Sequence, residues 1–331
     1  PLRPPVLYQV SCVRSWLRAR ICTIESEHTI LRAIFRHLRG VAVFSGFVVN
    51  TLLCFTPLLI LAIAKLLMPF GGIRRAITRV LMRIGETWVA VNSAILTAAG
   101  SIDWRATGLE TLRRDEWYLI IVNHVSAVDI LVLQKVFNRR IPFLKFFIKQ
   151  ELVWVPILGV AWWALNMPFM KRFSPKYLAR NPHMKGKDLE TTRRACKKFR
   201  YTPTSVINFV EGTRFSPGKR DSRNSPYRNL LQPRAGGFAV AMSSMGELFG
   251  SFLDVTLVYP DGPVSFWEMC CGVHARVLVD VREREVEEWL IAGDYQNDRN
   301  FRRRVHAWFG EIWQDKDDLI QQMLDTREPH D

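Results

Sequence analysis

The sequence lacks the features of small disulfide-stabilised and zinc-binding proteins. Its six cysteines are scattered, apart from the adjacent pair Cys270 and Cys271, and none of them has a C-x-x-C spacing. No disulfide framework is evident, which is typical of a domain that faces a reducing, cytoplasmic compartment. No repeat or low-complexity region stands out. At 331 residues the chain is long enough for one sizeable core with some appended helices.

Acidic residues are in the minority. The chain has 46 lysines and arginines against 31 aspartates and glutamates, which gives a formal charge of +15 and a pI near 9.9. This charge predicts anionic partners, either nucleic acid, anionic lipid or phosphorylated substrates. Nucleic acid is the weaker choice because no zinc spacing, basic zipper or RNP-like aromatic pattern is visible. We therefore expect anionic membrane lipids as partners and no nucleic acid.

Charged residues are absent from Gly40 to Ala64. A helix of about 25 residues measures about 37 Å, which is enough to cross the hydrocarbon core of a membrane. The segment is too long for a signal peptide and has no convincing cleavage site. Pro57 could break the helix, so we expect a membrane anchor that is either a single span or a re-entrant hairpin. Basic residues flank it on both sides, and the positive-inside rule places both flanks in the cytoplasm: Arg32, Arg36, Arg39, Lys65, Arg74, Arg75 and Arg79.

Strand and helix patterns alternate after residue 100, which predicts an α/β fold with a mixed sheet flanked by helices. The expected strands are Asp103–Ala106, Trp117–Val122, Met167–Met170, Ser205–Phe209, Val255–Tyr259 and Ala275–Val281. The expected helices are Val128–Phe137, Lys187–Phe199, Arg234–Met245 and an amphipathic helix over 301–312. An apolar stripe over 77–95 predicts one more helix, which either lies in the membrane interface or packs on the globular domain. The segment 216–226 is rich in serine, proline and basic residues, and we expect a mobile loop there.

The first motif is Asn123-His124-Val125-Ser126-Ala127-Val128-Asp129, which follows the apolar strand that ends at Val122. An imidazole is the usual group for removing a proton near neutral pH, and a carboxylate fixes its tautomer. A strand end followed by a helix start lets His124 and Asp129 fold back into contact, and a helix N-terminus favours an ionised aspartate. The alternative is a surface histidine and an aspartate that caps a helix.

The second motif is Glu211-Gly212-Thr213-Arg214, which follows the strand Ser205–Phe209. Gly212 allows close backbone approach to a ligand, and Arg214 offers a planar fork for a phosphate. Glu211 would be costly at a buried strand end without a partner. The alternative is a plain turn with a surface salt bridge. Both motifs lie at carboxyl ends of strands, where open α/β sheets bind ligands.

These two motifs resemble motifs I and III of the glycerolipid acyltransferases, above all the 1-acylglycerol-3-phosphate O-acyltransferases. Three further segments are similar to the same family, and the likeness runs from about residue 40 to the C-terminus: Lys149-Gln150-Glu151-Leu152 with Met167 to Arg172, Leu231 to Phe238, and Asp254 to Pro260. The chain departs from the usual pattern at Val125, Val210 and Tyr259. The likeness to a bacterial inner-membrane subgroup implies that location, with the catalytic domain facing the cytoplasm.

The resemblance implies a membrane-bound enzyme that moves a fatty acyl chain from an acyl thioester to a lysophospholipid hydroxyl. His124 would be the base and Asp129 its orienting group. Arg214 would hold the acceptor phosphate, with Glu211, Gly212 and Thr213 shaping the site. Lys149, Lys171 and Arg172 are further candidates for substrate contact. Acyl-CoA or acyl-acyl-carrier-protein would be the co-substrate, with no cofactor and no metal.

Two rival functions remain open. One is a transacylase or hydrolase that uses the same histidine and aspartate on phospholipids, and the other is a non-catalytic lipid-binding membrane protein. Ser126 lies near His124, but the resemblance implies no acyl-enzyme, so we interpret Ser126 as a turn residue. The expected domains are an N-terminal extension of uncertain start over 1–36, a membrane anchor with an interfacial helix over 37–100, and the acyltransferase domain over 101–331. The first methionine is Met68, and this is why the true start is uncertain.

Overall fold

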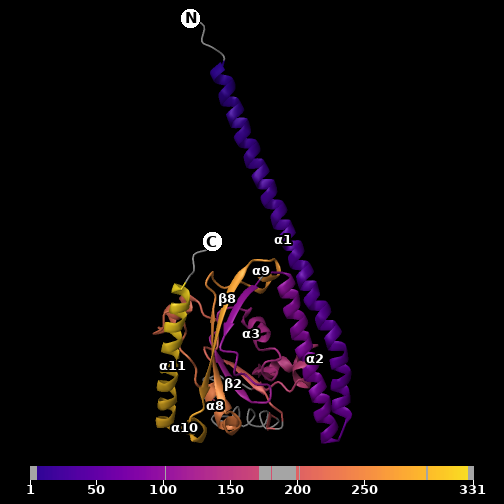
Figure 1. The fold of residues 1–331 in the computed structure, drawn as a ribbon, viewed down its shortest axis with the longest axis vertical. Helices are drawn as coiled ribbons and strands as arrows, with labels where there is room; N and C mark the ends of the chain where they lie inside the picture. The colour runs from indigo at the N-terminus through magenta and orange to yellow at the C-terminus, as the bar shows by residue number, and fades with distance from the viewer. Residues whose placement is uncertain are drawn as a thin grey trace.

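A computed structural model describes residues 6–100, 102–170, 180, 199–200, 202–295 and 297–326. The chain folds into a mixed β-sheet with helices on both faces, and two long helices extend from it at the N-terminal end (Figure 1). The predicted fold class is therefore confirmed.

The main sheet has the strand order β1-β8-β7-β2-β6-β3. The β7–β8 pair is antiparallel, and the other neighbouring pairs are parallel. A separate parallel pair is formed by β4 and β5. The sequence patterns predicted every main strand except β3; β3 and β4 are too short to produce a periodic signal. The strands are β1 (Ile102–Thr107), β2 (Tyr118–Val122), β3 (Leu144–Phe146), β4 (Ile148–Lys149), β5 (Phe169–Met170), β6 (Ser205–Phe209), β7 (Ser251–Val258) and β8 (Ala275–Glu285).

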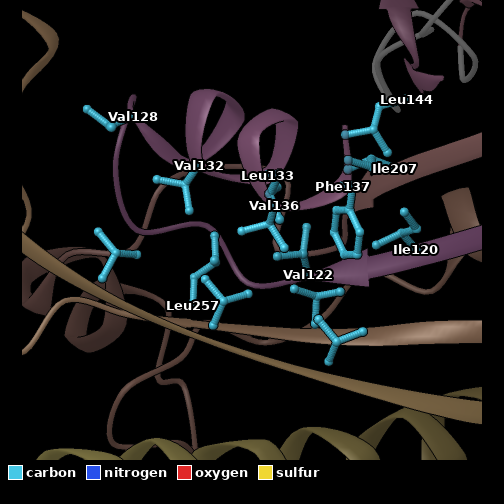
Figure 2. Packing of buried hydrophobic residues seen from close by; sticks show 14 of the residues in the cluster. Ile120, Val122, Val128, Val132, Leu133, Val136, Phe137, Leu144, Ile207 and Leu257 are labelled. Atoms are coloured by element: carbon cyan, nitrogen blue, oxygen red, sulfur yellow. The ribbon is translucent and has the colours of Figure 1, made fainter. Parts of the chain in front are cut away.

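Strand β2 lies at the centre of the core, and all five of its residues are buried. Successive side chains of a strand point to opposite faces. Ile120 and Val122 pack against α3 (Asp129–Phe137) in the cluster that Figure 2 shows. The opposite face carries Leu119 and Ile121 and is covered by α8 (Gly236–Met245), α10 (Glu288–Ala292) and α11 (Arg299–Asp325). Burial on both faces explains why β2 reads as a continuous apolar run.

The N-terminal helices are α1 (Val6–Leu67) and α2 (Gly71–Ala98), and they form a helical hairpin (Figure 1). The possible helix break at Pro57 does not occur: α1 continues through it. Leu58 and Ala62 follow Pro57 and are buried against α2 and α4, and this packing compensates for the one lost backbone hydrogen bond. Inside the hairpin, Asn50 Nδ2 donates to Asn92 Oδ1 at 2.8 Å.

One face of α1 lies along the globular domain over much of its length. The His37 ring stacks on Trp267, Phe47 packs edge-on against Phe266, and Lys65 Nζ donates to the Ala164 carbonyl at 3.0 Å. The other face is apolar and exposed, and the stretch 31–67 is long and apolar enough to cross a membrane. The stripe of α2 packs inward, with its buried residues facing α1 and the domain: Leu81, Val89 and Leu96.

One of the remaining elements corrects an expectation. Segment 216–226 is not simply a loop, because α7 (Pro217–Ser222) forms there. Ser216 caps this helix by accepting from the Lys219 backbone N–H, and proline occupies its first turn. The predicted helix Lys187–Phe199 lies outside the described residues, except for its last residue. The other short elements are η1 (Gln150–Trp154), α4 (Leu158–Ala164), η4 (Gly246–Leu248) and α9 (Phe266–Cys270).

Candidate active site

The first motif forms a closed turn at the end of β2. The side chain of Asn123 fixes the start of this turn: it donates to the Leu257 carbonyl at 2.9 Å and accepts from the Leu257 N–H at 2.8 Å. Asp129 Oδ2 then accepts from the backbone N–H groups of Val125 at 2.7 Å and Ser126 at 3.0 Å. The five-residue connection is thus wrapped around the Asp129 carboxylate, which is fully buried at the start of α3.

His124 and Asp129 are in contact, as their spacing predicted. His124 Nδ1 lies 2.8 Å from Asp129 Oδ2, and the ring of Phe209 lies against the imidazole with 4.2 Å between centroids. The His124 side chain is 19% exposed. Because Nδ1 faces a carboxylate, the proton of the neutral ring resides there, and Nε2 carries the free lone pair. Among the described residues nothing occupies Nε2, so this nitrogen is available to a substrate.

Tyr259 is a third member of this network that the sequence did not reveal. It follows β7, and its Oη donates to Asp129 Oδ1 at 2.6 Å. Burial and the neighbouring Asp129 charge raise the pKa of the Tyr259 phenol well above its usual value, so the hydroxyl stays protonated and acts as a donor. Both oxygens of the buried carboxylate are therefore satisfied. The unusual Tyr259-Pro260 pair was the only sequence feature that marked this residue. Its contact with Asp129, 130 positions away, could be recognised only from the folded structure.

Ser126 has a structural role in the turn. Its Oγ donates to the Val264 carbonyl at 2.6 Å and accepts from the Val128 N–H at 3.1 Å. A hydroxyl held in this way is not aligned with His124, which favours its interpretation as a turn residue.

The second motif lies beside the first. The N–H of Phe215 donates to the His124 carbonyl at 2.7 Å and ties the two segments together. Gly212 has a φ of +70°, a conformation that side-chain-bearing residues rarely adopt. Thr213 Oγ1 accepts from Lys219 Nζ at 3.2 Å. The Arg214 side chain is exposed and makes no ion pair with any residue that the structure describes.

Glu211 is not where the sequence suggested. Its carboxylate is fully buried and does not line the cavity. The backbone N–H groups of Leu231 and His124 are close enough to favour its charged form, but neither makes a well-formed hydrogen bond to it. Burial raises its pKa to about 8, and the charge of Lys316 only partly opposes this shift. Glu211 is therefore a neutral acid near pH 7. We expect Glu211 to pack beneath the residues that line the cavity and not to contact an anionic substrate.

Lys316 is the second residue that sequence reasoning missed. It comes from α11 and is buried, and its Nζ lies 2.6 Å from Asp254 Oδ1. It also donates to the Val255 carbonyl at 2.6 Å. Burial lowers the pKa of the Lys316 amine, and the Asp254 carboxylate opposes this shift. The sequence feature that could have revealed this role is the position of Lys316, a charged residue on the apolar face of an amphipathic helix.

An apolar cavity of about 650 Å³ opens at His124. The hairpin α1–α2, helix α4 and strand β6 form most of its wall, and Phe143, Phe146 and Trp162 contribute aromatic side chains. Its polar lining residues include His124, Thr213 and Arg214, besides Thr51, Gln134 and Asn208. A mostly apolar cavity with a few convergent polar groups is the usual form of a small-molecule site. Helices α1 and α2 therefore form part of the candidate site.

The weaker candidates are not brought into the site by the described structure. Lys149 contributes backbone to β4, and its side chain lies outside the described part, as do Lys171 and Arg172 altogether. Within the described ranges, no group of three or more histidine, cysteine, aspartate or glutamate residues is arranged to hold a metal ion.

Known proteins resemble this chain over the segment that holds both motifs. A family model described as Acyltransferase matches residues 103–266. The 1-acyl-sn-glycerol-3-phosphate acyltransferase 3 of Arabidopsis thaliana is 27% identical over 188 residues, which are 52% of this chain and 47% of that protein. The delta enzyme of Homo sapiens is 26% identical over 232 residues, which are 66% of this chain and 56% of that protein. The chain thus spans about half the length of these curated relatives.

Among solved structures, the 1-acyl-sn-glycerophosphate acyltransferase PlsC of Thermotoga maritima is similar, with a TM-score of 0.48 and 17% identity. The match covers 84% of this chain and 98% of that one.

Proposed function

Because this chain belongs to the glycerolipid acyltransferase family, we propose that it transfers a fatty acyl group from a thioester to the hydroxyl of a lysophospholipid. The acceptor we propose is 1-acylglycerol-3-phosphate, which would give phosphatidic acid. The observation that carries this proposal is the His124–Asp129 pair, whose histidine lines an apolar cavity that Arg214 also lines. Acyl-CoA or acyl-acyl-carrier-protein would supply the acyl group, and no further cofactor takes part.

The proposed chemistry is one direct displacement. His124 Nε2 accepts the proton of the acceptor hydroxyl, and the oxygen attacks the thioester carbonyl. The new C–O bond forms, the C–S bond breaks, and the electron pair leaves on the thiolate, which takes the proton from the imidazolium or from water. Asp129 stabilises the imidazolium, and Tyr259 holds Asp129 in place. The apolar cavity would take the acyl chain.

Arg214→Ala is expected to raise the apparent KM for 1-acylglycerol-3-phosphate about tenfold or more, with less effect on the thioester donor. The reason is the loss of a bidentate, charge-assisted contact with the acceptor phosphate. Arg214→Lys should recover only part of the loss, because an ammonium group cannot reproduce the planar fork. The measurement is a pair of acceptors that differ only in the phosphate, 1-acylglycerol-3-phosphate and the matching monoacylglycerol. An equal loss on both would show that Arg214 supports structure or the donor instead.

We also propose that α1 and α2 lie in one leaflet of the membrane, with the exposed apolar face of α1 toward the lipid. The catalytic domain would lie on the same side of the membrane as that leaflet. The opposite face of α1 contacts the globular domain from His37 to Lys65. A helix that crossed the bilayer by itself would be surrounded by lipid over this stretch and could not make these contacts. These contacts favour an interfacial α1–α2 hairpin over a single span. The re-entrant hairpin expected from a break at Pro57 does not form, because α1 is continuous there. The basic flanks favour a cytoplasmic catalytic domain, at the inner membrane of a bacterium.

The full chain should stay in the membrane fraction in high salt and be released by detergent, because burial of apolar surface is not screened by salt. Sedimentation of washed membranes measures this. Replacing exposed Leu53 with arginine should weaken retention, whereas Gln314→Arg on the solvent face of α11 should not. Complete release of the unaltered chain by salt alone would exclude an apolar anchor.

A further inference from the structure

A second cavity, of about 560 Å³, is lined in part by Arg234, whose side chain lies next to Gly212. It is lined by Arg223 and Arg234, by Tyr295 and His306, and by Gly236 at the start of α8. We propose that this basic cavity binds the phosphate groups of the acyl donor, a thioester such as acyl-CoA that carries a diphosphate. The proposal rests on the proposed function, since it names the part of the site that would hold the donor's anionic end.

Arg234 connects the basic cavity to the candidate active site. Its backbone N–H donates to the Val210 carbonyl at 2.7 Å, which fixes the residue beside the end of β6. Its side chain then crosses Gly212: a Cβ atom added to that glycine would lie 3.3 Å from Arg234 Cδ and 3.4 Å from a guanidinium nitrogen. Gly212 itself lines the apolar cavity. The Arg234 side chain therefore lies beside a residue of the apolar cavity and also lines the basic cavity.

The arginines of this cavity have no carboxylate partner. In the described structure neither Arg223 nor Arg234 makes a side-chain hydrogen bond or ion pair. Other arginines of the same domain do find such partners: Arg276 pairs with Asp261 at 2.9 Å, and Arg284 with Asp254 at 3.0 Å. The carboxylate nearest in sequence to Arg223, Asp221, pairs with Arg220 at 2.8 Å instead. Two guanidinium groups in one cavity that make no ion pair with a described carboxylate are suited to binding an anion.

The other lining groups are also suited to an anion. Ala235 precedes α8 and provides no side chain to accept from the first backbone N–H groups of that helix, one of which belongs to Gly236. His306 Nε2 lies 3.0 Å from Tyr295 Oη, and the two side chains form the opposite wall. Cationic side chains and free N–H donors are what a phosphate binds.

The two cavities together match a thioester donor, which has an apolar end and an anionic end. The acyl chain would enter the apolar cavity and place its carbonyl near His124. The leaving thiol would point across Gly212 toward Arg234, and the phosphates would lie in the basic cavity. Arg214, on the rim of the apolar cavity, would remain free for the acceptor phosphate.

The test compares two donors, palmitoyl-CoA and palmitoyl-N-acetylcysteamine, which carries the same thioester without any phosphate. Arg234→Ala and Arg223→Ala should each raise the KM for palmitoyl-CoA about tenfold and leave the KM for the phosphate-free donor unchanged. Arg234→Lys should restore part of the effect. Arg228→Ala is the matched control, because Arg228 is exposed on the same segment, has no side-chain partner among the described residues, and lines neither cavity. It should behave like the unaltered enzyme.

Three outcomes would overturn the proposal. Equal KM increases on both donors would show that Arg234 merely supports Gly212. An increase for 1-acylglycerol-3-phosphate but not for palmitoyl-CoA would assign the cavity to the acceptor or to a lipid headgroup. Calorimetric titration of the solubilised protein with free CoA gives a readout that needs no turnover. Weaker CoA binding by Arg234→Ala supports the cavity even if no thioester is turned over, and in that case the proposed function alone would fail. Unchanged CoA binding contradicts the cavity itself.

Discussion

His124→Ala is expected to reduce acyl transfer by about a thousandfold or more while the chain still folds and stays in the membrane. The base is lost, but the turn around it is not. Asp129 keeps three donors without the histidine, namely the N–H groups of Val125 and Ser126 and the hydroxyl of Tyr259. The imidazole, which is 19% exposed, contributes little else beyond its contact with Phe209.

The measurement is the initial rate of thioester-dependent phospholipid formation, together with thermal unfolding in detergent. His274→Ala is a suitable control, because His274 is exposed and lies away from both cavities. Its rate should match that of the unaltered enzyme. If His124→Ala kept a substantial fraction of the rate, His124 would not be the base.

Asp129→Asn should cost about a thousandfold as well, and the geometry indicates why. The N–H groups of Val125 and Ser126 need an acceptor, so they would orient the amide oxygen toward themselves and toward His124. The amide nitrogen would face Tyr259, whose hydroxyl can rotate to accept. The turn would keep its shape but lose the negative charge that stabilises the imidazolium. This differs from the sequence-based expectation, in which the loss came from the wrong tautomer.

Comparison with Tyr259→Phe separates charge from geometry. That change removes one hydrogen bond to Asp129 but keeps its charge, so it should cost far less activity. The kcat of both variants, measured over a range of pH with saturating substrates, provides the test. Losses of equal size would mean that Asp129 acts mainly by fixing the turn, and that its charge contributes little.

The sequence reveals the features of the site that depend on neighbouring residues. The five-residue spacing predicted the contact between His124 and Asp129, and the apolar runs predicted β2 and β6 closely, because a strand end and the following helix start are local features. The apolar segment 40–64 predicted a long apolar helix, and α1 contains it. The roles of these residues in catalysis and in membrane binding stay predictions.

Features that depend on distant contacts could not be predicted. Tyr259 reaches Asp129 only because β7 lies beside β2 in the sheet. The uninterrupted helix at Pro57 depends on packing against α4, about a hundred residues away in the sequence. Glu211 looked like a ligand residue because its neighbours Gly212 to Arg214 face the cavity, whereas its own side chain turns into the core.

The position of the anchor helices has a consequence for the chemistry. Residues of α1 and α2 such as Phe55, Leu58 and Trp88 line the same cavity as His124. A lipid substrate could therefore pass from the membrane to the base without crossing water. If so, the hairpin would contribute to the KM for lipid substrates and not only to attachment.

The most direct measurement is an acyl-transfer assay on purified enzyme in lipid vesicles, with radiolabelled palmitoyl thioester and 1-acylglycerol-3-phosphate. We expect labelled phosphatidic acid that appears only when both substrates are present and disappears with His124→Ala. Labelled free fatty acid without acceptor-dependent product would instead indicate a hydrolase, and product formed from phospholipid without the thioester would indicate a transacylase. No product of any kind from folded, vesicle-bound protein would contradict an enzymatic role for the His124–Asp129 pair.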